Sequence, residues 1–202
     1  MLKLAGETLN GLLAEHISQP DAHMSDLFQT IRTGSYHGIP YAAYDSEAAI
    51  TADTLYAVPF FVARSSSWDR IAIDVTTDYA DKSARLGIYK GDGNLYPDSL
   101  LTDSEGEVSV ATLGLKAVTI DIKLSKGLYW LAVVSDGAPS LRRYGRGWTP
   151  LGVDSSSTRY SFAGWSVAHT YGSLPNPFSS GGIMFNDGGN DWKIMLRLKS
   201  LD

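Results

Sequence analysis

The hydrophobic positions before residue 34 repeat with the period of an α-helix. Two stretches on either side of Gln19-Pro20 place apolar residues three and four positions apart, which gives each predicted helix one apolar face. These candidate assembly residues are Leu9, Leu12, Leu13, Ile17, Met24, Leu27, Phe28 and Ile31. Asp21 suits the N-cap of the second helix and Gly34 suits its end. Because such short helices are marginal alone, we expect the rest of the domain or another subunit to cover their apolar faces.

From about residue 53 the period of the pattern changes to two. Apolar and polar residues then alternate, as they do in strands with one buried and one solvent-facing side. The alternating segments are 71–76, 85–89, 118–124 and 192–199. Residues 128–134 are apolar on both sides, which predicts a central strand that is covered on both faces.

Short turn sequences separate these predicted strands. They lie at residues 90–94, at residues 104–106 and at Lys126-Gly127. Many short strands without helices between them predict a mainly β protein with an antiparallel, jelly-roll-like β-sandwich, and disfavour a doubly wound parallel sheet. We expect a helical anchoring or oligomerisation segment at residues 1–34, followed by the sandwich domain at residues 35–202.

Residues 135–191 combine loop-forming residues with aromatic and arginine side chains. Gly, Ser, Asn and Pro are frequent there, and short strands are predicted only at residues 159–167 and 183–185. We expect the remainder to form long loops that the sandwich holds in place.

Composition and charge exclude several classes of function. The 17 basic and 22 acidic residues give a net charge of −5, which argues against a nucleic-acid surface or a polybasic membrane patch. With no cysteine, the chain has no disulfide, thiolate zinc site or cysteine nucleophile. The longest apolar run, residues 55–63, is too short for a membrane helix, and no signal peptide is visible at the N-terminus. We therefore expect a soluble protein without membrane insertion.

Strand and turn residues between positions 55 and 138 carry a resemblance to a known family. They are residues 56–60, 68–71, 74–77, 85–89, 95–101 and 127–135, followed by Gly137. Their order resembles a β-sandwich module of structural proteins of tailed bacteriophages, found in tail fibres, spikes and other virion appendages. The resemblance covers about two fifths of the chain. It implies a virion component in a symmetric oligomer, with host-surface binding in some members, and it brings no catalytic residues.

Patterns for enzyme and metal chemistry are weak. The four histidines are scattered, no Gly-x-Ser-x-Gly motif occurs, and we expect His169 to bond backbone at a strand end or in a loop. The oxygen-rich residues 186–191 favour a hairpin turn over a calcium loop. Asp45 with Glu47, and the acids within residues 103–107, are typical of surface carboxylates rather than a glycosidase pair. We predict no enzymatic activity, metal or cofactor.

Aromatic and arginine residues in the loops form the best candidate binding site. Aromatic platforms beside arginine can hold the apolar faces and hydroxyl edges of sugars. The candidate residues are Arg143, Tyr144, Arg146, Trp148, Tyr160, Trp165 and Tyr171. The same residue types are enriched at subunit interfaces, and we favour packing or an interface over a glycan site.

Together these patterns predict a non-enzymatic structural component of a phage or phage-like particle, such as a fibre, spike or tail-tip subunit. It would be assembled in the bacterial cytoplasm and docked to other virion proteins through its N-terminal segment. Homo-oligomers would make weak contacts with the host surface effective through avidity. Two alternatives remain: a glycan- or receptor-binding module that uses the loops at residues 141–178, and an adaptor or decoration protein without a ligand.

Overall fold

The computed structural model describes residues 31–38, 45–102, 104–144, 162–186 and 192–201. The chain divides into two compact units, residues 1–31 and residues 32–202. The predicted helices lie outside the described residues, and Ile31 is the one candidate assembly residue that is described. The fold presented below is that of the second unit.

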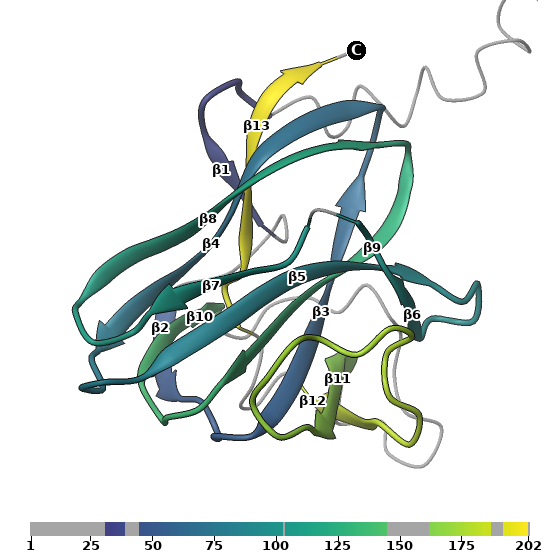
Figure 1. The fold of residues 1–202 in the computed structure, drawn as a ribbon. Coiled ribbons are helices and arrows are strands. Elements are labelled where there is room, and N and C mark those ends of the chain that lie inside the picture. The colour runs from purple at the N-terminus through teal and green to yellow at the C-terminus, as the bar shows by residue number, and fades with distance from the viewer. Residues whose placement is uncertain (1–30, 39–44, 103, 145–161, 187–191, 202) are drawn as a thin grey trace, which may run out of the picture. The chain divides into compact units, whose positions relative to one another are not determined.

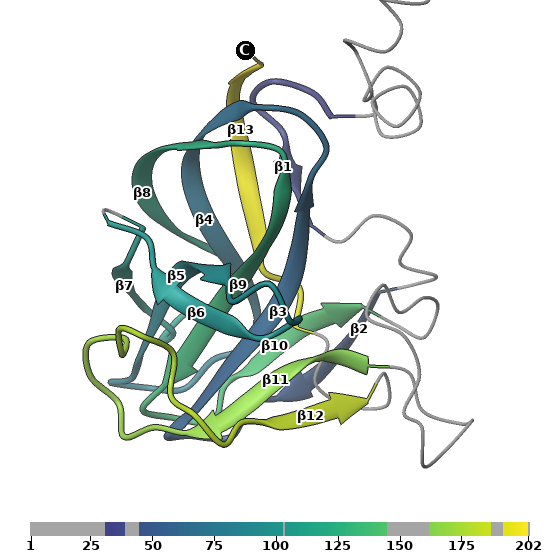
Figure 2. The ribbon, with the colours of Figure 1, turned by 90° about the vertical axis from the view of Figure 1, so that its right-hand side faces the viewer.

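Six antiparallel strands form the first sheet around the long strand β4 (Figures 1 and 2). Strand β8 pairs along one side of β4, and β13 and β10 pair with successive parts of the other side. Strand β1 extends the sheet beyond β13, and β2 extends it beyond β10. The strands are β1 (Tyr36–His37), β2 (Asp45–Ala49), β4 (Ser66–Thr77), β8 (Gly114–Leu124), β10 (Ser140–Tyr144) and β13 (Met195–Leu201).

Seven antiparallel strands form the second sheet, in the order β12-β11-β3-β9-β5 with β6 and β7 both on the far side of β5. The strands are β3 (Thr54–Val62), β5 (Ser83–Gly91), β6 (Pro97–Leu100), β7 (Gly106–Ser109), β9 (Gly127–Ser135), β11 (Phe162–Ala168) and β12 (Ile183–Asn186). Pro59 is accommodated in β3 because the pairing with β11 ends at Ala57, so no neighbour on that side needs its missing N–H.

The prediction of a mainly β, antiparallel fold is confirmed. The alternating segments lie in β4, β5, β8 and β13, and residues 128–134 form β9, which lies between β3 and β5. Ile71, Ile73 and Val75 form one buried face of β4, and Ala72 on the opposite face is buried as well. None of the described segments is a helix long and apolar enough to cross a membrane.

The main core lies between the two sheets. The rings of Phe60 on β3 and Trp68 on β4 meet edge to face with centroids 5.3 Å apart. Tyr56 on β3 meets Trp192, which precedes β13, at 5.6 Å. Because each pair joins one sheet to the other, the two sheets pack face to face as in a β-sandwich.

Three strands of the first sheet, β1, β2 and β10, were not predicted, and β13 begins later than predicted. Residues 135–158 were expected to be loop, yet β10 (Ser140–Tyr144) pairs with β4 and β2. Its Arg142 is neutralised by Asp74 on β4, at 2.7 Å from Nε to Oδ2, so a charged strand becomes compatible with the middle of a sheet. Strand β13 begins at Met195 rather than at Trp192, which forms an isolated bridge with Arg143.

Candidate functional site

The candidate ligand-binding residues lie on two different sheets. Arg143 and Tyr144 belong to β10 in the first sheet, whereas Trp165 belongs to β11 in the second and Tyr171 follows that strand. Arg146, Trp148 and Tyr160 lie outside the described residues. A single site built from all seven residues therefore remains a prediction.

Tyr144 and Arg143 are engaged by their own sheet. Tyr144 is only 8% exposed, and the Lys193 ammonium lies 5.7 Å from the centre of its ring. A side chain at Gly38 would overlap the Tyr144 hydroxyl, so this glycine permits the close approach of β1 to the ring. The Nε of Arg143 donates to the Ser46 hydroxyl on β2 at 3.2 Å. The Tyr144 ring is thus part of the packing rather than an open platform for a sugar.

A second hydrophobic cluster covers the outer face of the second sheet. Its buried members come from β3, β5, β9 and the β11–β12 loop (residues 169–182). They are Leu55, Ala57, Tyr89, Trp130, Ala132, Val134, Leu174 and Phe178. Figures 1 and 2 show the yellow-green loop running over these strands to β6. We call this group the outer cluster; Trp165 and Tyr171 pack against it as partly buried residues.

Polar ends of the aromatic side chains fasten the β11–β12 loop to the sheet. The Tyr89 hydroxyl donates to the Pro175 carbonyl at 2.8 Å. The Tyr96 hydroxyl donates to the Ser179 carbonyl at 2.6 Å and accepts the Gly182 N–H at 3.0 Å. Each of these two hydroxyls therefore already makes hydrogen bonds within the chain, which it would otherwise offer to a bound sugar.

The Trp165 side chain also bonds and packs against other residues of the chain. Its indole N–H donates to the Leu95 carbonyl at 2.7 Å, and its ring meets that of Tyr96 edge to face with centroids 4.7 Å apart. The side chain is only half-buried, so part of the ring reaches the surface. Among the described candidate residues, Arg143, Trp165 and Tyr171 are all partly accessible, whereas Tyr144 is buried.

Tyr171 and the start of the loop are held by Asp53, through its carboxylate and its backbone carbonyl. The Tyr171 N–H donates to Asp53 Oδ1 at 2.7 Å, and the His169 N–H donates to the Asp53 carbonyl at 2.9 Å. The Nε2 of His169 lies 3.2 Å from the Ser173 carbonyl, which confirms the expectation of a histidine bonded to backbone. Burial, together with the negative charge of Glu107, raises the pKa of Tyr171 to about 12.

Charged side chains around the outer cluster neutralise one another. Arg85 contacts Glu105 at 2.9 Å and Glu107 at 3.1 Å, and its guanidinium carbon lies 6.0 Å from the centre of the Tyr171 ring. Glu105 Oε1 also accepts the Leu174 N–H at 3.0 Å, so this carboxylate holds the loop as well. Glu105 and Glu107 thus both form ion pairs with Arg85, and Glu105 also bonds the β11–β12 loop.

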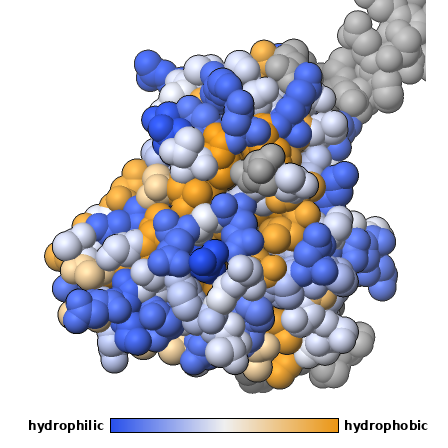
Figure 3. Space-filling model, viewed as in Figure 1, coloured by the Kyte–Doolittle hydropathy of each residue, from blue (hydrophilic) through white to orange (hydrophobic). Residues whose placement is uncertain are grey.

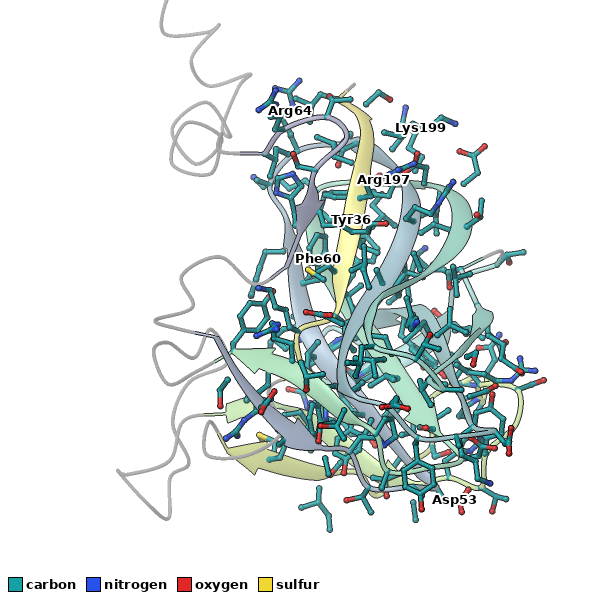
Figure 4. All side chains as sticks on the ribbon, turned by 90° about the vertical axis from the view of Figure 1, so that its left-hand side faces the viewer. Tyr36, Asp53, Phe60, Arg64, Arg197 and Lys199 are labelled. Atoms are coloured by element: carbon teal, nitrogen blue, oxygen red, sulfur yellow. The ribbon has the colours of Figure 1, made fainter. Side chains whose placement is uncertain are left out.

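The cations of β13 are paired too. Arg197 contacts Asp69 at 2.6 Å, and Lys199 contacts Asp121 at 2.7 Å. Figure 4 shows Arg197 and Lys199 at the opposite end of the domain from Asp53. Among the described residues, no group of three His, Asp or Glu side chains is arranged to hold a metal ion.

An exposed apolar area on β12 was not singled out from the sequence. Ile183 is 73% exposed and Met184 is 37% exposed. Met184 is the register partner of Trp165, so these two side chains lie on the same face of the sheet. Figure 3 shows hydrophobic residues at the lower margin of the molecule, where β11 and β12 end in Figure 1.

The sequence contains a signal for this area that periodicity does not reveal. No Asp, Glu, Lys or Arg occurs from Tyr160 to Asn186, although 19% of the whole chain is charged. Buried parts of protein interfaces are depleted of charged residues in the same way. The β11–β12 region therefore combines exposed apolar side chains with an absence of charge, as an interaction surface does.

Comparisons with protein-family models, with curated proteins and with solved structures give no match to this chain.

Proposed function

We propose that this chain is a non-enzymatic structural subunit of a phage or phage-like particle, of the fibre, spike or appendage type. The observation that carries the proposal is the absence of charged residues from β11 and β12 together with the exposure of Ile183 and Met184. An apolar surface without charge suits a permanent contact with another protein better than a contact with a polar substrate.

The arrangement of the strands supports a jelly-roll-like form of the sandwich. Strand β1 pairs with β13, β3 with β11, β4 with β10 and β5 with β9, so that successive pairs are nested along the chain. Nested antiparallel pairing of this kind results when a long hairpin is rolled into two sheets. The segments that resemble the phage module contribute β3, β4, β5, β6 and β9 of this arrangement.

In this proposal the N-terminal segment docks the chain to other virion proteins and the sandwich faces outward. The candidate assembly residues from Leu9 to Ile31 would form the docking contact. The particle would be assembled in the bacterial cytoplasm. Repeated copies would turn weak contacts with a host surface into useful binding.

The direct test is co-purification with particles. Particles from the cells that produce the chain are separated on a density gradient, and every fraction is analysed by quantitative mass spectrometry. We expect the chain to be in the particle band at a fixed ratio to the other virion proteins, and to remain there in high salt. A chain that stays entirely in the particle-free fractions would contradict the proposal.

The glycan-binding alternative rests on Trp165, whose ring is half-buried beside Tyr96. It is tested by comparing the full chain with Trp165→Ala on an array of bacterial surface glycans. Binding by the wild type that is lost in a folded Trp165→Ala variant would favour this alternative. We expect no glycan-dependent signal that this substitution removes, because the indole N–H and the Tyr96 hydroxyl are already bonded within the chain.

A further inference from the structure

Strand β12 is an edge of the second sheet. It pairs with β11 on one side, from Ile183 opposite Ser166 to Asn186 opposite Phe162, and no other strand of the described residues pairs with it. An edge strand presents backbone N–H and C=O groups that can pair with a further strand. The free side of β12 is therefore a place where the sheet can continue.

The other edges carry charges that hinder such pairing. Every other edge strand of more than two residues in the described part of the chain contains an acid or a lysine. They are Glu47 on β2, Asp98 on β6, Glu107 on β7, and Lys116, Asp121 and Lys123 on β8. Charged residues on an edge are a common protection against unwanted strand pairing, and β12 (Ile183–Asn186) lacks this protection.

Both faces of β12 are apolar at the point where it is exposed. Met184 lies on the face of Trp165 and the outer cluster. Ile183 and Phe185 lie on the opposite face, where Phe185 is buried against Tyr56 with ring centroids 6.0 Å apart. A strand with apolar residues on both faces is typical of the interior of a sheet, so the sequence of β12 suits a strand with two neighbours.

The absence of charged residues along β12 favours a second copy of this chain as the neighbouring strand. The chain carries a net charge of −5, so most contacts between two copies must overcome repulsion or bury charged groups. A contact through β12 itself buries no charged side chain, because the region from Tyr160 to Asn186 contains no Asp, Glu, Lys or Arg. A second copy supplies the matching surface, since two identical strands can pair antiparallel about a two-fold axis with the same residues on each side.

We propose that two copies of this chain dimerise by antiparallel pairing of their β12 strands, which joins the two second sheets into one continuous sheet. Ile183 and Met184 are the central apolar contacts of this interface. The inference deepens the proposed function, on which it rests for its biological role, by naming the partner and the surface. Because a two-fold contact closes on itself, it gives a dimer rather than an open fibre.

The test is the solution mass of the full chain and of two matched variants, measured by sedimentation velocity over a range of concentrations. Ile183→Lys places a charge on the β12 edge, and Leu115→Lys places one at a leucine on the β8 edge that is also exposed, at 49% against 73% for Ile183. We expect the wild type and Leu115→Lys to have twice the 21.9 kDa mass of one chain. Ile183→Lys is expected to raise the dimer dissociation constant about 100-fold or more, because each dimer would contain the buried charge twice.

Amide hydrogen exchange supplies the second readout. Successive N–H groups of a strand point to opposite sides, so one of the adjacent N–H groups of Met184 and Phe185 faces away from β11. That N–H is expected to exchange slowly in the wild-type dimer and faster in the monomeric Ile183→Lys variant, with the exchange of its neighbour and of β4 unchanged in both. A wild type that is monomeric throughout, or a dimer that Ile183→Lys leaves intact, would overturn the proposal. A monomer found in the particle band would contradict only this inference, and a β12 dimer absent from particles would contradict only the proposed function.

Discussion

Leu95 has a left-handed backbone conformation, with φ at 59°, and its side chain is 47% exposed. In the left-handed region the Cβ of leucine is too close to the backbone, which destabilises this conformation, whereas asparagine and glycine tolerate it better. We expect Leu95→Asn to stabilise the fold by about 1 kcal/mol, because the bond from Trp165 uses the backbone carbonyl of residue 95 and is retained. Urea unfolding of the two proteins measures the difference.

Leu113→Asn is the matched control for this prediction. Leu113 is also exposed, but it is not among the described residues with a positive φ. The substitution should therefore change the free energy of unfolding by no more than about 0.5 kcal/mol. If Leu95→Asn proves less stable than the wild type, apolar contacts of the Leu95 side chain outweigh the backbone strain.

The raised pKa of Tyr171, about 12, predicts a loss of stability at alkaline pH. The unfolded chain releases this proton near pH 10, so the folded chain holds more protons between about pH 10 and pH 12. The contribution is complete below pH 10 and disappears as the pH rises through the folded pKa. Burial also raises the pKa of Tyr89 and of Tyr129, which therefore act in the same direction.

Urea titrations at several alkaline pH values test this expectation. Tyr171→Phe has no phenol to ionise, so its stability should decline less than that of the wild type across the same pH range. Equal declines in the two proteins would show that Tyr171 does not contribute to the alkaline transition.

At the scale of elements, the β11–β12 loop depends on Tyr96. The Tyr96 hydroxyl bonds both Ser179 and Gly182, at 2.6 Å and 3.0 Å. Tyr96→Phe leaves these two backbone groups without that partner, and we expect it to destabilise the fold by about 1–3 kcal/mol. Limited proteolysis should cut within residues 169–182 faster in this variant than in the wild type.

Tyr79→Phe provides the comparison, since Tyr79 is an exposed tyrosine at a different site. It should leave both the stability and the cleavage rate close to those of the wild type. Equal cleavage of Tyr96→Phe and the wild type would mean that contacts in the outer cluster, and not the hydroxyl, hold the loop.

Elements with a regular pattern could be predicted from the sequence, and elements that depend on distant partners could not. Alternation of apolar residues correctly located β4 and β8, because their faces have different environments. Strand β10 was missed because the charge of Arg142 is neutralised by Asp74, far away in the sequence. A pattern within one segment carries no information about such a partner.

The candidate site could likewise be predicted only in part, because its packing depends on residues distant in the sequence. Trp165 and Tyr171 were selected as aromatic residues of a loop-rich region, but the sequence does not show that an outer cluster lies beneath them. The charge-free stretch from Tyr160 to Asn186 is visible in the sequence. This stretch points to an interaction surface only when the topology shows that β12 lies at the edge of a sheet.

For the whole molecule, the proposals assign two kinds of contact to two different parts of the chain. The predicted helices at residues 1–34 would dock the chain to the particle, and β12 would join two copies. Deletion of residues 1–34 is therefore expected to abolish co-purification with particles while the remaining protein, residues 35–202, stays dimeric. The main core and the outer cluster are built from residues beyond position 34, so this deletion should leave them folded.

Density-gradient fractions and sedimentation velocity separate the two effects. A truncated protein that is folded but monomeric would place the subunit contact in the N-terminal segment, and Ile183→Lys would then leave the full-length oligomer intact. A truncated protein that still joins particles would instead place the docking surface on the sandwich. The exposed apolar residues of β12 would then be the first docking surface to test, because no charged residue of the chain lies between Tyr160 and Asn186.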